Sequence, residues 1–293
     1  MTEPVRFLAI GHVARDEFEG EPTWRLGGTA LYTAATAARL GARAAMVTRV
    51  GPNERAALAE RCAQLGVELH ALPAEVTTTF AFRYEDGRRL MRLKARARGL
   101  ALTDVPVALR SVRAVILGSI AHEIDRDLLG AFPDAARVVT AQGYLREWTA
   151  DGSIHPRRWD DAAEVMATAS AIVLSDDDVG GDLGEPRRWA ALHADKPLPL
   201  APVIVTFAER GSLVLVGGTE VTVPAYHADR VVDPTGAGDA FAAGLAVALA
   251  EHRPLIEGVR FAHAVASFAV EGVGTEGLAD RTRVEVRMAG SSA

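Results

Sequence analysis

The residues best suited to chemistry lie in one short stretch of the C-terminal third. From Asp233 to Asp239 the sequence reads Asp-Pro-Thr-Gly-Ala-Gly-Asp, and an Ala-rich segment follows it to about Glu251. This order predicts a glycine turn that opens a helix, whose first N–H groups have no partner within the helix and attract anions. The predicted anion-binding amides are those of Gly236, Ala237, Gly238 and Asp239.

Asp239 directly follows the glycines. A carboxylate at that place can accept the proton of an attacking hydroxyl, and charge on a transferring phosphoryl group would meet the positive end of the helix. The stretch therefore favours phosphoryl transfer to a hydroxyl, with Asp239 as the base. The alternative is a plain strand-to-helix turn, in which Asp239 only stabilises the first helical turn.

The elements that would position this stretch follow an alternating order. Short β-branched runs alternate with helical segments, two of which, Thr29–Leu40 and Glu54–Leu65, end just before a glycine. Such alternation predicts an α/β domain whose mostly parallel sheet lies between helices. The predicted strands are Arg6–Ile10, Ala44–Val50, Ala114–Leu117, Arg137–Thr140, Ala171–Leu174 and Val203–Thr206.

Two hairpins interrupt this alternation. Thr77–Tyr84 and Arg88–Ala97 are strand-like, and Glu85-Asp86-Gly87 between them contains an Asp-Gly pair typical of a hairpin turn. We expect this first hairpin to form a small β lid that covers one edge of the site. The strands of the second predicted hairpin, around Gly217-Gly218, are Ser212–Val216 and Glu220–Val223.

One face of the second lid strand is basic, because alternate side chains of a strand point to the same side. Two interpretations stay open. The face is either a solvated edge kept charged against aggregation, or a lid surface that brings positive charge toward phosphates or an anionic substrate. Its residues are Arg92, Lys94, Arg96 and Arg98.

Composition narrows the partners. The 293-residue chain has a net charge of −6, which argues against a general nucleic-acid binder. Its only cysteine, Cys62, cannot form an intramolecular disulfide, and neither a basic leader nor an apolar run of spanning length is apparent. We expect a cytoplasmic protein with one domain over residues 1–293, a monomer or homodimer, that binds neither nucleic acid nor membranes.

Other cofactor motifs fail in their context. Gly272–Gly277 formally matches a dinucleotide fingerprint, but it follows a helical segment instead of a strand. The sequence contains no P-loop, and His122-Glu123 lacks the second histidine of a zinc-binding helix.

The stretch from Asp233 to Asp239 resembles the signature Asp-Thr-x-Gly-Ala-Gly-Asp of the ribokinase-like (PfkB) carbohydrate kinases, with Pro234 as an addition similar to that of inositol-kinase-like members. The N-terminal segments Gly11–Asp16 and Gly27–Ala30 resemble the same family. The resemblance extends from about Val5 to Leu278. It implies a ribokinase-like fold whose small β lid is built from segments of about 16–25 and 77–97. It also implies phosphorylation of a sugar-like polyol that depends on ATP and Mg²⁺, with Asp239 as the base.

The resemblance also implies an acceptor site. Asp16 stands where the family has a substrate-binding aspartate, and Gly27-Gly28 corresponds to its substrate loop. Bare backbone at two glycines lets a polyol approach closely, and a carboxylate accepts hydroxyl hydrogen bonds. A solvated loop carboxylate is the alternative for Asp16. The acceptor-binding residues implied are Asp16, Gly27, Gly28, Thr29, Gln142, Arg146 and Asp239.

On the donor side, Val205–Gly211 resembles the family's loop Thr-x-Gly-x-x-Gly, with Ala208 in place of the first glycine. The resemblance implies that Asp178 binds Mg²⁺ through water, since Ser175–Asp178 matches the family's Asn-x-x-Glu motif by type. A plain acidic loop is the alternative for Asp178. The nucleotide-binding residues implied are Thr206, Gly211, Gly236, Gly238 and His263, and those of a monovalent-cation site for K⁺ are Asp233, Thr235 and Gly274.

The acceptor itself is predicted from finer features. Pro234, Thr77–Phe80, Ala141–Arg146 and Ser175 resemble the inositol-kinase-like branch. They favour a cyclitol such as myo-inositol. The alternatives are a sugar, a sugar acid or a nucleoside, and a non-catalytic sensor that binds a sugar or nucleotide on the same fold.

Overall fold

The computed structural model describes residues 3–85, 88–192 and 200–290 of the chain. Its largest element is a nine-stranded sheet with the order β15-β14-β13-β12-β9-β8-β1-β4-β5, here called the main sheet. The strands from β13 to β5 in this order pair in parallel, whereas β14 and β15 form an antiparallel edge. The bounds are β1 Arg6–Gly11, β4 Arg43–Val50, β5 Glu68–Pro73, β8 Ala114–Gly118, β9 Ala136–Thr140, β12 Ala171–Ser175, β13 Val203–Thr206, β14 Ser212–Val216 and β15 Thr219–Val223.

The predicted alternation is confirmed. All six strands expected from β-branched runs are present, each within one residue of the predicted ends, and the hairpin around Gly217-Gly218 forms the antiparallel edge of the main sheet. The strand β5 was not predicted; its Glu68–Pro73 segment is only half-buried along most of its length, so it lacks a strong apolar run.

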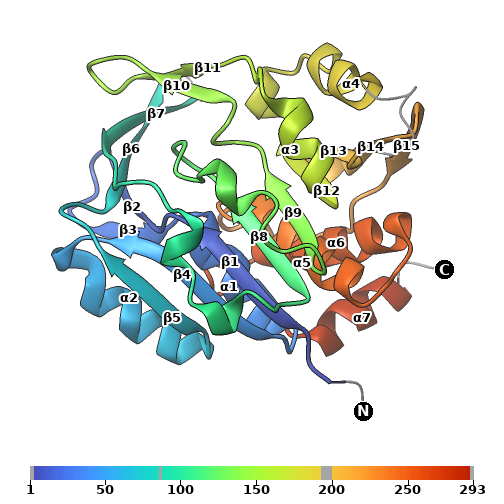
Figure 1. Cartoon of the computed structure of the whole chain (residues 1–293), viewed down its shortest axis with the longest axis horizontal. Coiled ribbons are helices and arrows are strands. Elements are labelled where there is room, and N and C mark those ends of the chain that lie inside the picture. Colours follow the sequence, from blue (N-terminus) through green and yellow to red (C-terminus); the bar gives the residue numbers. More distant parts are fainter. Residues whose placement is uncertain (1–2, 86–87, 193–199, 291–293) are drawn as a thin grey trace.

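Helices cover the main sheet on both faces (Figure 1). The side chains of β1 show why: Phe7 and Ala9 belong to one buried cluster, and Leu8 and Ile10 belong to the other. A strand buried on both faces is expected in a parallel sheet between helices. One face is covered by α1 Thr29–Arg39, α2 Pro52–Leu65, α5 Ala237–Ala250, α6 Leu255–Ala269 and α7 Arg281–Gly290, and the other by α3 Ala162–Thr168, α4 Gly184–Ala191 and several short 3₁₀ turns.

Local signals explain the ends of α2. Pro52 is its first residue, where a missing N–H does no harm because that group has no helical partner. Gly66 follows the last residue in a left-handed conformation with φ 69°, as predicted for a helix stop.

A second, four-stranded sheet with the order β3-β2-β6-β7, here called the small sheet, stands beside the carboxyl ends of the main-sheet strands (Figure 1). It contains the segments predicted at about 16–25 and 77–97. Asp86 and Gly87 of the predicted hairpin turn lie outside the described residues. The bounds are β2 Ala14–Phe18, β3 Trp24–Gly27, β6 Thr78–Glu85 and β7 Arg88–Ala95, and a separate ribbon joins β10 Arg146–Trp148 to β11 Ile154–Pro156.

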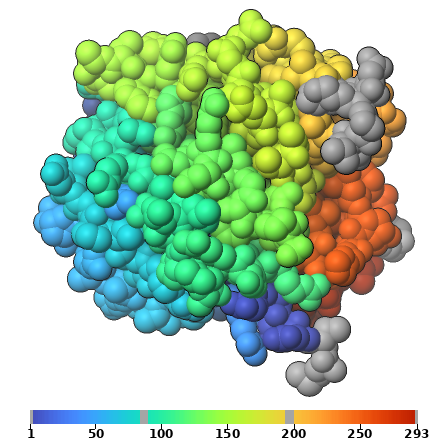
Figure 2. All heavy atoms as spheres, viewed as in Figure 1, coloured from blue at the N-terminus to red at the C-terminus, as the bar shows by residue number. Residues whose placement is uncertain are grey.

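The parts of the chain pack into one body. Figure 2 shows the green middle of the chain covering one face between the cyan N-terminal segments and the orange C-terminal helices. None of the described helices is both long enough and apolar enough to cross a membrane.

Candidate active site

A cavity of about 280 Å³ opens where the small sheet meets the main sheet. Three main-sheet strands end at its wall with a polar residue: β9 with Thr140, β12 with Ser175 and β13 with Thr206. The carboxyl ends of parallel strands are the usual ligand site of open α/β sheets. The N-terminus of α5 forms the floor, with Gly236, Gly238 and Asp239 among the lining residues.

Most of the predicted site residues meet at this cavity although they come from distant parts of the sequence. Residues of β2, α1, the segment after β9, the turn after β12 and the start of α5 all contribute. The predicted residues that line it are Asp16, Gly28, Thr29, Gln142, Arg146, Asp178, Thr206, Thr235, Gly236, Gly238 and Asp239. Those that do not are Gly27, Gly211, Asp233, Ala237, His263 and Gly274.

The glycine turn before α5 is only partly as predicted. Gly236 is left-handed with φ 82°, and a Cβ there would lie 2.5 Å from Cδ1 of Tyr32, so no other residue fits. Gly238 has no positive φ, and a Cβ there would meet nothing within 4 Å. Only Gly236 therefore needs to be glycine for its backbone conformation, whereas Gly238 lies in the first turn of α5, where its missing side chain leaves the cavity open.

The amides at the start of α5 also differ from the expectation. The amide of Ala237 donates to the carbonyl oxygen of Pro234 at 3.2 Å, so it closes the turn and is not available to an anion. The amides of Gly236, Gly238 and Asp239 have no hydrogen-bond acceptor among the described residues. Three amides, not four, are therefore available at the positive end of this helix.

Asp239 is linked to the acceptor-side residues by hydrogen bonds. Gln142 Nε2 donates to Thr29 Oγ1 at 2.8 Å, and the Thr29 hydroxyl in turn bonds to the Asp239 carboxylate. Burial raises the pKa of Asp239 to about 6, against the opposing effects of Thr29 and Arg146. A carboxylate with a raised pKa is a stronger proton acceptor and is still ionised at neutral pH.

Asp16 faces the cavity from β2 and is 6% exposed. The two glycines predicted for substrate contact have a packing role here. A Cβ on Gly27 would lie 2.0 Å from Asp16 Oδ2, and one on Gly28, at φ 92°, would lie 2.5 Å from the carbonyl oxygen of His12. Gly27 therefore makes room for the Asp16 carboxylate and does not itself line the cavity.

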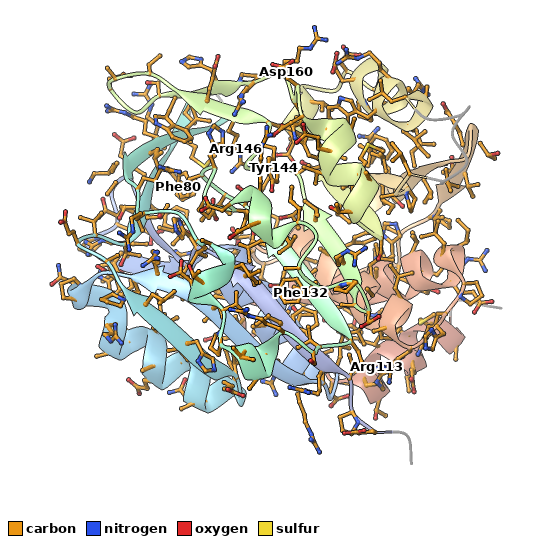
Figure 3. All side chains as sticks on the ribbon, viewed as in Figure 1. Phe80, Arg113, Phe132, Tyr144, Arg146 and Asp160 are labelled. Carbon is orange, nitrogen blue, oxygen red and sulfur yellow. The ribbon has the colours of Figure 1, made fainter. Side chains whose placement is uncertain are left out.

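Several cavity residues were missed from the sequence. Tyr32 lines the wall beside Gly236, and the small sheet contributes an apolar ceiling (Figure 3 labels Phe80). The Thr140 hydroxyl at the end of β9 is buried and has no hydrogen-bond partner among the described residues. The alternation of phenylalanines along β6 was a readable signal, whereas nothing in the sequence singled out Thr140. The ceiling residues are Phe80, Phe82, Met91 and Ile120.

Asp178 lies at the end of the cavity near β12 and β13. Its Oδ2 accepts both the amide and the hydroxyl of Ser175 at 2.9 Å, and its Oδ1 lies 3.3 Å from Arg146 Nη2. Within the described residues no group of three or more His, Cys, Asp or Glu side chains could hold a metal ion. A carboxylate beside phosphates and water is the kind of ligand that Mg²⁺ takes in proteins, and the binding of Mg²⁺ by Asp178 through water stays a prediction.

The predicted nucleotide loop keeps its backbone shape. Ala208 has φ 50°, so it adopts the left-handed conformation that glycine favours. Gly211 has φ 93°, and a Cβ there would lie 2.1 Å from the carbonyl oxygen of Val223. Gly211 therefore shapes the turn between β13 and β14 and does not line the cavity, and its contact with a nucleotide stays a prediction.

His263 does not lie in an open site either. It is 4% exposed, its Nε2 lies 2.8 Å from Ser212 Oγ, and its ring packs edge-on against Phe241. Burial lowers its pKa to about 4. The ring thus belongs to the core between α5, α6 and β14 and does not line the active-site cavity. The contact of His263 with a nucleotide stays a prediction.

The residues predicted for a monovalent cation line a neighbouring cavity of about 300 Å³ on the other side of Tyr32. Asp233 Oδ1 accepts the amide of Thr235 at 2.9 Å, and Asp233 Oδ2 lies 3.9 Å from Arg25 Nη1. Gly274 lines the same cavity. Since a guanidinium already supplies positive charge beside Asp233, a further cation fits poorly here, and we assign it no step.

The basic face of β7 points away from the active-site cavity. Lys94 Nζ bonds to Glu17 at 2.6 Å, and Arg92 and Arg96 donate to backbone carbonyl oxygens. Of the two interpretations, the contacts favour the charged, solvated face, because the side of β7 that reaches the cavity presents Met91.

Solved structures define the class of protein first. A pyrophosphate-dependent kinase in the ribokinase family, complexed with a pyrophosphate analog and myo-inositol, has a TM-score of 0.77 at 20% identity over 96% of this chain and 99% of that one. Ribokinase of Arabidopsis thaliana, complexed with ribose and ATP, has a TM-score of 0.72 at 20% identity over 98% and 99%. The fold is therefore the ribokinase fold, as predicted.

The sequence comparison then identifies the family. The profile of the pfkB family carbohydrate kinases matches residues 18–281, so this chain belongs to that family. Membership implies a phosphotransferase that acts on a hydroxyl group. Ribokinase of Bacillus subtilis is 38% identical over 86 residues, which are 29% of each chain. The matched segment thus spans less than a third of that relative.

Proposed function

We propose that this protein transfers the γ-phosphoryl group of ATP to a hydroxyl of a ring-shaped polyol. The observation that carries the proposal is the placement of Asp239, which lies at the positive end of α5 and also bonds to Thr29 on the acceptor side. One carboxylate thus stands between a site for phosphoryl charge and a site for hydroxyls. Positioning and charge stabilisation supply most of the catalysis in phosphoryl transfer.

The residues divide into two roles. The free amides of Gly236, Gly238 and Asp239 stabilise the charge on the phosphoryl group during its transfer. The Asp239 carboxylate accepts the proton of the attacking hydroxyl. Asp16, Thr29 and Gln142 bind the other hydroxyls of the acceptor. The unpartnered Thr140 hydroxyl is a further acceptor contact, because a buried hydroxyl without a partner is expensive unless a ligand satisfies it.

The shape of the cavity supports a neutral ring as acceptor. A polar floor faces an apolar ceiling that includes Phe80 and Phe82, so a ring with hydroxyls at its rim would place its C–H face against the aromatic side chains. Arg146 is paired with Asp178, which leaves it poorly suited to bind the carboxylate of a sugar acid. A cyclitol such as myo-inositol therefore fits best, and a neutral sugar is next.

Mg²⁺, when bound with the donor, would neutralise phosphate charge near Asp178. Pyrophosphate is a second candidate donor, because Gly211 and His263 do not reach the cavity and a pyrophosphate-dependent kinase is among the structural neighbours. We further propose that the small sheet acts as a lid that keeps water, the competing acceptor, out of the site.

The test is a turnover measurement with each donor separately, ATP and pyrophosphate. The acceptors are myo-inositol, ribose, a ketodeoxy sugar acid and a nucleoside, and ³¹P NMR identifies the products. Asp239→Asn is the matched control for contaminating kinases. We expect a phosphomonoester of myo-inositol at the highest kcat/KM. Binding of an acceptor without any turnover would mean a sensor, and faster turnover of the sugar acid would overturn the neutral-ring assignment.

A further inference from the structure

The base of the small sheet holds three consecutive buried threonines. Thr77, Thr78 and Thr79 are 3%, 0% and 7% exposed where β6 begins. Successive side chains of a strand point to opposite faces, so Thr77 and Thr78 contact different elements outside the small sheet. Each of the two hydroxyls belongs to a hydrogen-bond network that contains a buried carboxylate.

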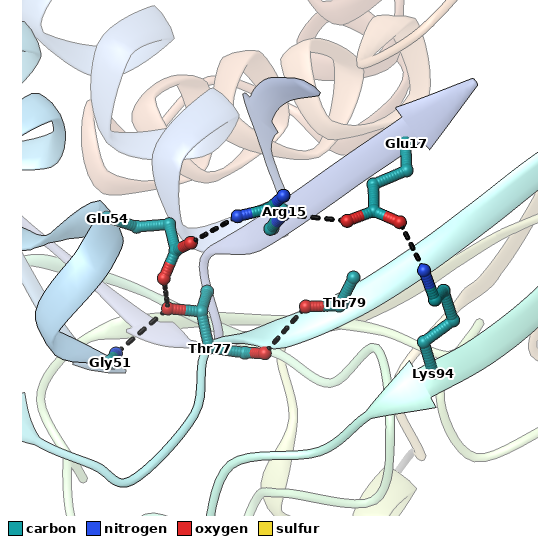
Figure 4. Close-up of polar contacts among 7 residues, drawn as sticks. All are labelled: Arg15, Glu17, Gly51, Glu54, Thr77, Thr79 and Lys94. Atoms are coloured by element: carbon teal, nitrogen blue, oxygen red, sulfur yellow. Dashed lines mark hydrogen bonds and ion pairs between the residues drawn. The ribbon is translucent and has the colours of Figure 1, made fainter. Parts of the chain in front are cut away.

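Helix α2 holds Thr77. The Thr77 hydroxyl donates to Glu54 Oε2 at 2.6 Å and accepts the amide of Gly51 at 2.8 Å (Figure 4). The other carboxylate oxygen of Glu54 accepts Arg15 Nη1 of β2 at 2.9 Å. Glu54 is 4% exposed, so this carboxylate ties two strands of the small sheet, β2 and β6, to α2.

His12 holds Thr78 from the other side. Nε2 of His12 lies 2.9 Å from the carbonyl oxygen of Arg98, and Nδ1 lies 2.8 Å from Thr78 Oγ1. A carbonyl only accepts, so the ring proton is on Nε2 and Nδ1 accepts the Thr78 hydroxyl. Thr78 Oγ1 also accepts the amide of Ala97 at 3.1 Å, beyond the end of β7. Burial lowers the pKa of His12, which keeps the ring neutral.

Glu123 completes this second anchor. It is fully buried, and its oxygens accept the amide of His12 at 3.1 Å, that of Ile120 at 2.9 Å and that of Ala121 at 2.7 Å, as well as the Ser119 hydroxyl at 3.1 Å. Burial opposes the ionisation of Glu123, whereas the hydrogen bonds donated by the amides of Ala121, His12 and Ile120 act to lower its pKa. Ile120 of the same loop lines the active-site cavity.

The anchored strand carries the ceiling over the acceptor. Phe80 follows Thr78 by two residues on β6, and it pairs in register with Asp16 of β2. Both side chains line the cavity. A displacement of the start of β6 would therefore change the distance between the apolar ceiling and the carboxylate that faces it.

We propose that the Thr77 and Thr78 hydroxyls are positioning groups that set the small sheet over the acceptor, through the buried anchors Glu54 and His12–Glu123. Neither hydroxyl is a catalytic group, because neither residue lines the cavity. The kinetic part of this inference rests on the proposed function, whereas the anchoring itself does not.

The test compares Thr78→Val with Thr78→Ser, and Thr77→Val with Thr77→Ser. Valine keeps the shape and removes the hydroxyl, which leaves His12 Nδ1 and the Ala97 amide without their partner. We expect Thr78→Val to raise the KM for the best acceptor of the panel about tenfold, the effect typical of an unsatisfied buried group, with the KM for the donor unchanged. Serine restores most of the loss.

Hydrogen exchange of the unliganded protein gives a second readout. In both valine variants we expect faster exchange in β6 and β7 and unchanged exchange in β12 and β13. Unchanged exchange in β6 and β7 overturns the anchoring. Faster exchange with an unchanged acceptor KM overturns the positioning role. If the wild type phosphorylates no polyol, the proposed function fails, while the exchange measurement still decides whether the hydroxyls anchor the sheet.

Discussion

Asp239 is the residue on which burial and catalysis make opposite demands. Burial raises the pKa of Asp239 to about 6, because it disfavours the ionised carboxylate relative to water. A general base, in contrast, must be ionised. We expect kcat/KM for the acceptor to fall tenfold per pH unit below about 6, because it follows the protonation of the enzyme form to which the acceptor binds. A pH profile with saturating donor checks this. A profile flat from pH 7 to 5 would exclude Asp239 as the base.

Asp239→Asn should lose activity and gain stability. We expect turnover to fall by about 10²–10⁴-fold, as for loss of a general base. A buried carboxyl whose folded pKa exceeds its unfolded value destabilises the fold at high pH, so the asparagine variant should unfold at pH 8 with a free energy roughly 1–3 kcal/mol higher. Urea unfolding at pH 8 and pH 4 measures this difference. The gain should shrink at pH 4, because the folded wild type is then protonated at Asp239 and the unfolded chain is about half protonated there.

Gly236 and Gly238 should respond differently to alanine. Gly236→Ala forces an L-residue to φ 82° with its Cβ against Tyr32, which we expect to lower the free energy of unfolding by about 1–3 kcal/mol or more. Gly238→Ala meets no atom within 4 Å, so stability should hold while the methyl narrows the cavity and lowers turnover about tenfold or more. Equal losses of stability in the two variants would contradict this assignment.

At the scale of elements, β6 joins anchoring and substrate contact in one strand. Phe80→Leu keeps an apolar ceiling but removes the aromatic face. We expect the acceptor KM to rise about two- to tenfold, the worth of an aromatic contact, with the donor KM unchanged. Steady-state kinetics with each substrate varied decides it. An equal rise in both KM values would place Phe80 outside the acceptor site.

The helices and strands also show how much of the fold could be predicted from the sequence. The main-sheet strands were predictable because burial on both faces demands continuous apolar runs, such as Val203–Thr206. The segment of about 16–25 was expected in the lid, but its separate strands β2 and β3 were not predicted, since Ala14–Phe18 and Trp24–Gly27 are short and largely polar. Their order depends on pairing with β6, which is distant in the chain.

The candidate site was predictable to a similar extent. A motif names residue types, so Asp239, Asp16 and Thr29 were found, yet a motif does not tell which backbone groups remain free. The bond from the Ala237 amide to Pro234 and the burial of His263 depend on packing that only the folded chain determines. Thr140 carries no motif at all.

At the scale of the whole molecule, buried neutral histidines make stability depend on pH. Burial lowers the pKa of His263 to about 4, so the unfolded chain binds more protons between about 4 and 6.5. The contribution of His263 to the free energy of unfolding is fully present above pH 6.5 and is lost as the pH falls toward 4. We expect His263→Gln to reduce the loss of unfolding free energy between pH 7.5 and 5 by about 2 kcal/mol. Identical losses in both proteins would contradict a neutral buried ring.

The reactivity of the only cysteine measures local unfolding around α2. Cys62 is 1% exposed in α2, and burial raises the pKa of its thiol to about 11, so the native protein presents almost no thiolate to a reagent at neutral pH. A disulfide reagent such as dithionitrobenzoate would react only in molecules that have opened around α2. Since Glu54 of the same helix anchors the small sheet, the labelling rate of an otherwise unmodified protein should slow when a bound acceptor holds that sheet in place. The protein would thus report its own ligands without any engineered label.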